Sequence, residues 1–448
     1  MANIKGTTRR NFLEGTGSSD RIYGDGTSLS ARTAGSDQLH GYGGADFLYG
    51  DVRTLGGTGR GGADSFWAGD DRDSVYGDAY TLKGSARGGA DKIWGERGYD
   101  LLFGDARSMT SSTVGGADRL YGGHDEDTLY GDAYTMTSRA VGGNDTLSGN
   151  QDDDTVYGDA YSMANEAKGG WDAVYGDDGR DILYGDARVL RDASVGGSDS
   201  LWGGNSEDTL HGDGYQLQHS AVGGNDTLYG GSGSDKIYGD AYMLYDSALG
   251  GSDYISGQSG IGTLYGDGYA MYGSSVGGND SIHGSTSNDT LYGDAASLND
   301  SSAGGHDYLN GSSGNDTIYG DARITGTSAT YGNDSLYGGS GNDRLIGDSD
   351  YGGTGADYLN GGSGNDTLDG GGGRDVFAFD HSSGKDTILY FRSGEDQIDL
   401  RAWRFAEFDD IQMAQRTDYT AIYLSGTSHY IKLMSVQQTS LSAADFIL

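Results

Sequence analysis

Residues Gly223–Leu249 read GGNDTLY, GGSGSDKIY and GDAYMLYDSAL, and this 27-residue stretch decides the fold. We call the three pieces the first arm (223–229), the second arm (230–238) and the third arm (239–249). In each repeat a Tyr-Gly-Asp tripeptide, or a variant with Phe, His or Ile in place of Tyr, spans the junction between the second arm and the third arm. Its glycines are Gly24, Gly50, Gly77, Gly104, Gly131, Gly158, Gly185, Gly212, Gly239, Gly266, Gly293, Gly320 and Gly347, separated by 27 residues after a first step of 26. A fixed period of this length is typical of a solenoid.

Three columns of apolar residues keep the same period. They run from Leu39 to Leu336, from Ile22 to Leu345 and from Leu29 to Leu298. One apolar residue between polar ones indicates a short, half-buried strand, which is buried only when repeats stack. The pattern predicts an all-β protein, a right-handed parallel β-solenoid (β-roll or β-helix) of about thirteen 27-residue coils with a small C-terminal β cap. Two alternatives stay open: the third arm loops out and leaves a two-sided 18-residue roll, or 18-residue turns run through the 27-residue repeat.

The composition excludes several classes of protein. The chain has 448 residues, of which 85 are Gly, none is Cys and none is Pro, and its net charge is −38. Without Cys there is neither a disulfide framework nor a Cys zinc site. The negative charge disfavours nucleic acid and anionic membranes as partners, and no apolar stretch is long enough to span a membrane. Low hydrophobicity with this charge predicts disorder unless the acid is neutralised.

Two columns of turn aspartates follow the period. The first-arm column is Asp37, Asp64, Asp91, Asp118, Asp145, Asp172, Asp199, Asp226, Asp253, Asp280, Asp307 and Asp334. The second-arm column is Asp20, Asp46, Asp73, Asp100, Asp127, Asp154, Asp181, Asp208, Asp235, Asp289, Asp316 and Asp343, broken at Gly262, and Asp357, Asp366 and Asp375 continue at nine-residue spacing. Stacked carboxylates repel, so the columns predict cations between coils. Ligands that are all oxygen favour many Ca²⁺ ions over Zn²⁺ or Mg²⁺; the alternative is simple solvated turns.

A third column of acid follows the Tyr-Gly pairs. Its members are Asp25, Asp51, Asp78, Asp105, Asp132, Asp159, Asp186, Asp213, Asp240, Asp267, Asp294, Asp321 and Asp348. These side chains either complete the Ca²⁺ shell or cap the turn by accepting hydrogen bonds from backbone N–H groups. Both hypotheses stay open from the sequence.

The nonapeptides GGSGSDKIY (230–238), GGSGNDRLI (338–346) and GGSGNDTLD (361–369) resemble those of RTX (repeats-in-toxin) proteins. The resemblance covers residues 11 to 376 and implies that the turns bind Ca²⁺ between coils and that the chain folds after export. The segments DQIDL (396–400) and DFIL (445–448) resemble the uncleaved C-terminal signal region of type I secreted proteins such as the serralysins. The start MANIKGTTRRNF lacks the apolar core of a signal peptide, so we expect export through the C-terminus.

The expected organisation has four parts: an N-terminal tail (1–10), the 27-residue repeats (11–348), tandem nonapeptide turns (349–376), and a C-terminal cap and secretion signal (377–448). Strands are expected around Val376 to Phe379, Ile388 to Phe391 and Ile398 to Leu400. A tyrosine stripe precedes the third arms and is expected to line an edge of the solenoid as a stacking ladder that covers backbone. The alternative is a flat aromatic surface that binds sugar rings or a neighbouring solenoid. The stripe comprises Tyr23, Tyr49, Tyr76, Tyr130, Tyr157, Tyr184, Tyr238, Tyr265, Tyr292 and Tyr319.

The sequence therefore predicts an extracellular or cell-surface calcium-binding structural protein that is not an enzyme, since no catalytic arrangement stands out from the repeat. It folds on binding Ca²⁺ outside the cell and forms part of a surface layer or matrix. The expected partners are the type I secretion machinery, other copies of the chain and cell-surface polysaccharide. One alternative is a carbohydrate-binding adhesin that uses the tyrosine stripe. Another is a polysaccharide lyase or epimerase on a parallel β-helix, by analogy of fold alone.

Overall fold

The computed structural model describes residues 2–26, 29–424 and 429–448. The chain divides into two compact units, residues 1–236 with 240–249 and residues 237–239 with 250–448. Each unit is a parallel β-solenoid, and together they contain about 13 coils with almost no helix. The prediction of an all-β parallel solenoid is confirmed. No helix in the described ranges is both long enough and apolar enough to span a lipid bilayer.

A coil of the first unit consists of three short strands, one for each arm. In one coil these are β10 (Lys92–Arg97), β11 (Leu101–Phe103) and β12 (Ala106–Met109). The third arm is therefore a strand, and the two-sided roll with a looped-out third arm is wrong. Strand partners lie 27 residues apart, as for Ile93 and Leu120 or Met109 and Met136, which also contradicts 18-residue turns.

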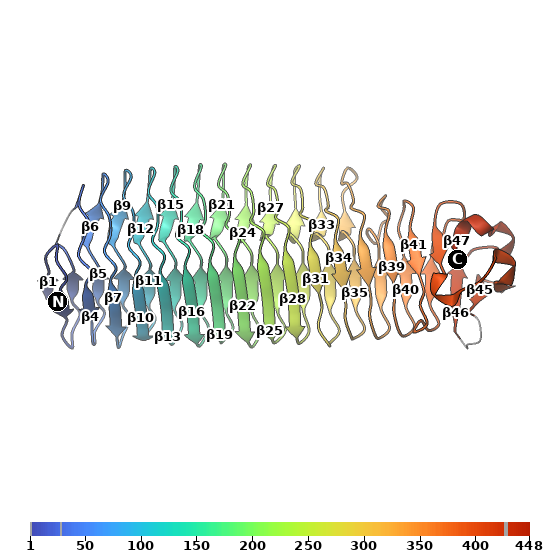
Figure 1. Ribbon diagram of the computed structural model, residues 1–448, viewed down its shortest axis with the longest axis horizontal. Coiled ribbons are helices and arrows are strands. Elements are labelled where there is room, and N and C mark those ends of the chain that lie inside the picture. Colours follow the sequence, from blue (N-terminus) through green and yellow to red (C-terminus); the bar gives the residue numbers. More distant parts are fainter. Residues whose placement is uncertain (1, 27–28, 425–428) are drawn as a thin grey trace. The chain divides into compact units, whose positions relative to one another are not determined.

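The strands of the first unit form three parallel sheets, which can be followed in Figure 1. The first-arm sheet contains, besides β10, strands β2 (Phe12–Glu14), β4 (Gln38–His40), β7 (Ser65–Gly69), β13 (Arg119–His124), β16 (Thr146–Gln151), β19 (Ala173–Asp178), β22 (Ser200–Asn205) and β25 (Thr227–Ser232). The second-arm sheet contains, besides β11, strands β1 (Asn3–Lys5), β3 (Arg21–Tyr23), β5 (Phe47–Tyr49), β8 (Ser74–Tyr76), β14 (Thr128–Tyr130), β17 (Thr155–Tyr157), β20 (Ile182–Tyr184) and β23 (Thr209–His211). The third-arm sheet contains, besides β12, strands β6 (Val52–Leu55), β9 (Ala79–Leu82), β15 (Ala133–Met136), β18 (Ala160–Met163), β21 (Ala187–Leu190), β24 (Gly214–Leu217) and β27 (Ala241–Leu244). Strand β26 (Lys236–Tyr238) lies at the division between the units.

The core of each coil is made by one inward apolar side chain per strand. Ile93, Leu102 and Met109 have no exposed surface, and their counterparts in neighbouring coils are equally buried. Residues on either side of them point outward because side chains alternate along a strand. Each apolar side chain therefore packs on its own copy in the next coil, as the three columns predicted.

The second unit begins with the same three-stranded coils and then loses the third arm. Its strands are β28 (Tyr254–Ser259), β29 (Thr263–Tyr265), β30 (Gly268–Met271), β31 (Ser281–His283), β32 (Thr290–Tyr292), β33 (Ala295–Leu298), β34 (Tyr308–Asn310), β35 (Thr317–Tyr319), β36 (Ala322–Thr325), β37 (Ser335–Tyr337), β38 (Arg344–Ile346), β39 (Tyr358–Asn360), β40 (Thr367–Asp369), β41 (Val376–Ala378), β42 (Thr387–Leu389) and β43 (Gln397–Asp399). Strand β36 is the last strand of the third-arm sheet among the described residues. Beyond it, β39 pairs with β41 only 18 residues later, so these coils have two sides.

The end of the chain closes the second unit with a small mixed sheet. Strands β44 (Gln412–Gln415), β45 (Tyr419–Tyr423) and β46 (Tyr430–Met434) are antiparallel to one another, and β46 pairs in parallel with β42. Strand β47 (Phe446–Ile447) adds in parallel to β43. The connections contain four single-turn 3-10 helices, η1 (Arg401–Trp403), η2 (Phe408–Asp410), η3 (Gln438–Ser440) and η4 (Ala443–Asp445).

Gly116 illustrates how closely the coils approach. An added Cβ at Gly116 would overlap the carbonyl oxygen of Gly89 in the preceding coil, whereas one at Gly43 would meet nothing within 4 Å. We expect Gly116→Ala to lower the free energy of unfolding by about 1–3 kcal/mol, the usual cost of overpacking. Gly43→Ala is the matched control and should leave it nearly unchanged. Urea unfolding in millimolar Ca²⁺ measures both, and equal stability of the two variants would contradict the close stacking.

Candidate metal sites

The first-arm aspartates form a continuous hydrogen-bonded column. The backbone N–H of Asp91 donates to Oδ1 of Asp118 at 2.7 Å, and the N–H of Asp118 donates to Oδ1 of Asp145 at 2.7 Å. The second oxygen, Oδ2, of these three residues is buried and accepts no hydrogen bond from the protein. One carboxylate oxygen per coil is thus bound to the backbone N–H of the preceding coil, and the other needs a partner of a different kind.

The second-arm column repeats this arrangement on another side of the coil. The N–H of Asp100 donates to Oδ1 of Asp127 at 2.8 Å, and that of Asp127 donates to Oδ1 of Asp154 at 2.7 Å. Their Oδ2 atoms also accept no hydrogen bond from the protein. Burial, reinforced by the neighbouring carboxylates, raises the pKa of Asp127 to about 9 and that of Asp154 to about 8. At Gly262, which interrupts the column, the N–H still donates to Asp289 at 2.6 Å.

The third column, which was left out of the predicted ligand set, lies beside the first. Asp78 and Asp105 have no exposed surface, and each accepts a hydrogen bond from the second glycine of the following first arm, Gly89 or Gly116, at 3.0–3.1 Å. The column therefore caps the turns, as one of the two hypotheses proposed. After burial, the charge of Asp91 is the largest influence that raises the pKa of Asp78, so first- and third-column carboxylates are close enough to repel each other. Sequence reasoning missed this juxtaposition because the two columns are 13 residues apart along the chain.

Glycines create the space in which the free carboxylate oxygens gather. An added Cβ at Gly77 would overlap both Oδ2 of Asp91 and the carbonyl oxygen of Gly104 in the next coil. In the second arm, a Cβ at Gly122 would lie 2.6 Å from Oδ2 of Asp127 and 2.6 Å from the carbonyl oxygen of Gly149. At both places an unpartnered carboxylate oxygen and a glycine carbonyl oxygen from the following coil converge beside a residue without a side chain.

These donors fit a calcium ion. They are all oxygen atoms, they combine carboxylates with main-chain carbonyls, and they come from successive coils, which is the donor chemistry that Ca²⁺ prefers. No group of three or more His, Cys, Asp or Glu side chains in the described ranges is arranged to hold a metal ion. Main-chain carbonyl oxygens, such as those of Gly104 and Gly149, lie beside the free carboxylate oxygens and would complete the shell of an ion between two coils.

Every predicted ligand is buried, with an exposed fraction of 4% or less. The alternative of solvated turns is therefore wrong for these residues. Burial raises the pKa of the first-column carboxyls well above the ordinary value, and neighbouring aspartates add to the shift. Fully ionised columns without a counter-charge would be strongly destabilising, because each buried charge repels the ones above and below it.

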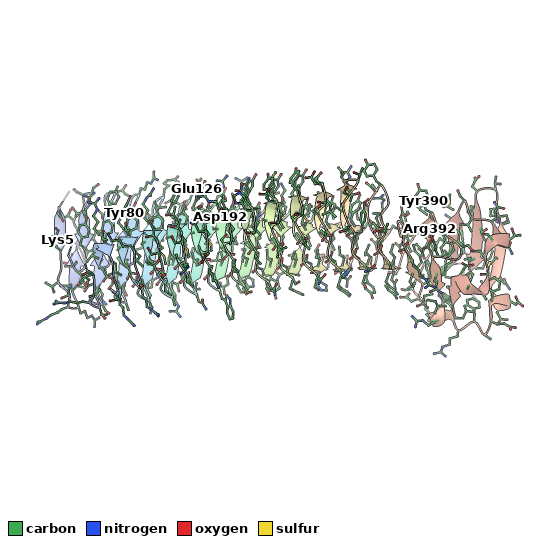
Figure 2. All side chains as sticks on the ribbon, turned by 90° about the horizontal axis from the view of Figure 1, so that it is seen from above. Lys5, Tyr80, Glu126, Asp192, Tyr390 and Arg392 are labelled. Atoms are coloured by element: carbon green, nitrogen blue, oxygen red, sulfur yellow. The ribbon has the colours of Figure 1, made fainter. Side chains whose placement is uncertain are left out.

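The last rung of the column contains a cation supplied by the chain itself. Arg392, labelled in Figure 2, places Nη2 at 3.7 Å from Oδ2 of Asp375 and 3.6 Å from Oδ1 of Asp396. The same nitrogen donates to the carbonyl oxygen of Gly373 at 3.0 Å. A guanidinium group here lies among two carboxylates of successive coils and a glycine carbonyl, the same kinds of donor that surround Gly77.

The tyrosine stripe is not on the surface. In the first unit Tyr23, Tyr49, Tyr76, Tyr130, Tyr157 and Tyr184, together with Phe103, form one stack of rings whose members are 0–8% exposed. Ring centroids are 4.7–5.0 Å apart. The rings form the stacking ladder that the sequence predicted, and their burial contradicts the alternative of an open aromatic surface for sugar rings.

A second row of side chains on the third-arm sheet covers this stack. Tyr134 meets Tyr130 edge to face, with centroids 5.9 Å apart and planes at 70°. Arg107 lies between two rings of the outer row, with its guanidinium carbon 4.9 Å from the Tyr134 centroid and 6.0 Å from that of Tyr80. The outer row thus combines aromatic and cation–π contacts. The alternation of side chains along the second-arm strand could not predict this row, because its residues come from the third arm.

A family model described as RTX calcium-binding nonapeptide repeat (4 copies) matches more than half of the chain. The matched residues are 3–27, 33–52, 58–79, 85–106, 113–133, 139–160, 167–187, 196–214, 220–241, 275–297, 302–322, 328–350 and 351–380. They include every Tyr-Gly-Asp turn or its variant except the one at residues 265–267, and many of the turn aspartates described above. A search of curated proteins found no match.

Without metal, folding should depend on pH in a definite direction. Burial raises the pKa of Asp73 to about 8, that of Asp100 to about 7 and that of Asp208 to about 8, above the value near 4 expected in the unfolded chain. A raised carboxyl pKa contributes stability that is fully present below the unfolded pKa and is lost as the pH rises through the folded pKa. In EDTA we expect the β signal in circular dichroism near pH 4 to disappear between about pH 6 and pH 9.

Calcium should reverse this dependence, because protons compete with the metal for the same carboxylates and apparent affinity rises with pH. The control is therefore the same pH series in millimolar Ca²⁺, where the β signal should persist at neutral and alkaline pH. A metal-free β signal that is constant with pH, or that grows as the pH rises, would contradict the proposed burial of the columns.

Proposed function

Because the chain belongs to the family of RTX calcium-binding nonapeptide repeat proteins, we propose that it is a secreted structural protein whose coils fold when Ca²⁺ binds outside the cell. The observation that carries this proposal is the set of buried Oδ2 atoms that accept no hydrogen bond and stand one per coil beside glycine carbonyls. Bound Ca²⁺ supplies the positive charge that lets these oxygens be buried while ionised.

The chain's own residues position the carboxylate oxygens that would bind the metal. Backbone N–H groups hold Oδ1 of each aspartate and so aim Oδ2 toward the glycines, as Asp91 is held through its hydrogen bond with Asp64. The third column fixes the Gly-Gly turn through the N–H of the second glycine. Since these donors come from successive coils, metal binding and coil stacking are the same event, and binding free energy becomes folding free energy.

A calcium titration tests the proposal. Starting from EDTA-treated protein at pH 7.5, we expect the β signal to rise cooperatively with Ca²⁺ and the hydrodynamic radius to fall. Mg²⁺ at equal concentration should be a poor substitute, because it needs a tighter octahedral shell and dehydrates reluctantly. Asp118→Asn should shift the Ca²⁺ midpoint upward, whereas Asp125→Asn, at an exposed position of the second-arm turn, should leave it nearly unchanged. Full β signal and compact size in EDTA at this pH would overturn the proposal.

Export through the C-terminus is the second part of the proposal. The segments Asp396–Leu400 and Asp445–Leu448 lie side by side, since Ile398 is paired with Phe446 and Asp399 with Ile447. The Asp445 carboxylate accepts hydrogen bonds from the Gly394 N–H at 2.7 Å and the Ser442 N–H at 2.7 Å. These contacts support a single recognition element made from both segments.

Removal of residues 445–448 tests export. In a bacterial host with a type I exporter, we expect the truncated chain to stay in the cells while the full chain reaches the medium. Thr439→Ala is the mild control, because this exposed residue lies outside both segments. Equal amounts of full and truncated chain in the medium would rule out the C-terminal signal.

We also propose that copies of the chain associate in a surface layer or extracellular matrix. Strand β1 pairs with β3, and no strand of the described residues pairs with its other edge. Such an edge is a template for strand addition by a second copy. Light scattering at several protein concentrations in millimolar Ca²⁺ should show a mass that rises above 46.8 kDa, and a constant monomer mass would contradict association.

A further inference from the structure

The outward face of the first-arm sheet bears a row of stacked rings near the start of the chain. His40 and Trp67 are 4.3 Å apart between centroids with their planes 3° from parallel, and Trp67 is followed by Trp94 at 5.2 Å. The three side chains are half-buried, and they occupy matching positions on β4, β7 and β10. Their faces cover one another, so the row presents ring edges to solvent.

A pocket opens beside this row because one side chain is missing. Two residues further along the same strands and connections, the corresponding positions are Tyr42, Gly69 and Glu96. Gly69 has no side chain to fill the space between its neighbours, and a pocket of about 230 Å³ is lined by His40, Tyr42, Trp67, Gly69, Asp70 and Glu96. The Tyr42 hydroxyl donates to Glu14 Oε1 of the preceding coil at 2.8 Å, which holds the ring on the side away from Glu96.

The two residues that flank the gap are held in an unfavourable backbone conformation. Tyr42 and Glu96 both have φ of 75°, in the left-handed region that side chains rarely adopt. At the same position of neighbouring coils stand Gly69, with φ of 115°, and Gly123, with φ of 122°. Glycine accepts this conformation without strain, so the repeat itself does not require Tyr or Glu there. Asn150, Asp177 and Gln258 occupy the same position in other coils with φ of 82°, 73° and 59°, so the left-handed backbone belongs to the repeat, and the side chains of Tyr42 and Glu96 are what distinguish these coils.

The residues that line the pocket indicate the charge and the chemical class of its ligand. Asp70 and Glu96 are exposed carboxylates, and no Lys or Arg contributes to the pocket. The ring of Tyr42 is 51% exposed and its neighbour in the next coil is Gly69, so aromatic surface and negative charge face the same space. Aromatic rings with carboxylates attract soft organic cations, whereas a hard cation such as Ca²⁺ prefers a shell of oxygen atoms.

We propose that this pocket between Tyr42 and Glu96 binds an alkylammonium group, the cationic head of a choline-like or amine-bearing ligand. The cation lies against the Tyr42 ring and is paired with the Glu96 and Asp70 carboxylates, while the edges of His40 and Trp67 form the wall behind it. The site is separate from the buried metal columns, because its carboxylates are on the outer surface.

Saturation-transfer NMR on the full chain, in 150 mM NaCl and millimolar Ca²⁺, tests the proposal with choline as the probe. Its uncharged isostere 3,3-dimethyl-1-butanol is the matched ligand control, and methyl glucoside tests for a neutral sugar. We expect saturable binding of choline alone. Tetramethylammonium and spermidine distinguish a quaternary ammonium group from primary amines as the preferred source.

Three variants connect binding to the pocket. Tyr42→Gly should weaken choline binding about fivefold, the loss of one exposed cation–π contact, and should leave folding intact because glycine suits the left-handed position. Glu96→Gln should weaken it to a similar extent. Glu126→Gln, an exposed carboxylate one coil further along (Figure 2), is the control and should bind like the original chain. Circular dichroism in Ca²⁺ confirms that each variant is folded before binding is measured.

Three outcomes would overturn the proposal. Equal binding of the uncharged isostere would show that the pocket recognises shape or apolar surface and not charge. Preference for methyl glucoside would assign the pocket to neutral sugars. Choline binding that is unaffected by Tyr42→Gly and Glu96→Gln, or that Glu126→Gln weakens equally, would reduce the effect to general attraction by an acidic protein.

Discussion

Repulsion between carboxylates stacked at the spacing of one coil is the constraint on which the rest of the structure depends. Two like charges about 4.8 Å apart cost roughly 3 kcal/mol at an effective dielectric constant of 20, and each column repeats this cost along the chain. Hydrogen bonds from backbone N–H groups of the preceding coil hold one oxygen of each of these aspartates but leave the other unpartnered. Without protons or metal ions this repulsion opposes compaction, so we expect the fold to depend on the pH and the metal content of the solution.

The repeat predicts most of the architecture because, when coils stack, residues that are one period apart in the sequence become neighbours in adjacent strands. Columns such as Ile93 and Leu120 are paired in the structure as the 27-residue spacing requires. The same logic located the buried aspartates. It did not show that Asp78 faces Asp91, because that contact depends on how a coil bends between its arms, which periodicity does not contain.

The outward-facing residues were harder to predict. Alternation along a strand places Tyr130 opposite the inward Leu129, yet Tyr130 is only 4% exposed because Tyr134 of the adjacent sheet covers it. A single strand's pattern cannot reveal burial by a neighbouring arm. The pocket at Gly69 could not be predicted for a related reason. It exists because one coil lacks a side chain that the coils on both sides possess, and an analysis of the period identifies only residues that recur in every coil.

The register of the coils has a consequence for how such a chain changes length. Almost every contact between neighbouring coils joins residues 27 apart, so inserting or deleting one whole repeat reproduces the same interfaces with one coil more or fewer. Shorter steps occur only beyond the third-arm sheet, where the third arm is shortened or lost: the hydrogen bond from Asp334 to Asp357 spans 23 residues and that from Asp357 to Asp375 spans 18. Duplication of DNA segments that encode single coils could therefore lengthen the protein without redesigning its interior, whereas an insertion within a strand would displace every aspartate after it in that coil.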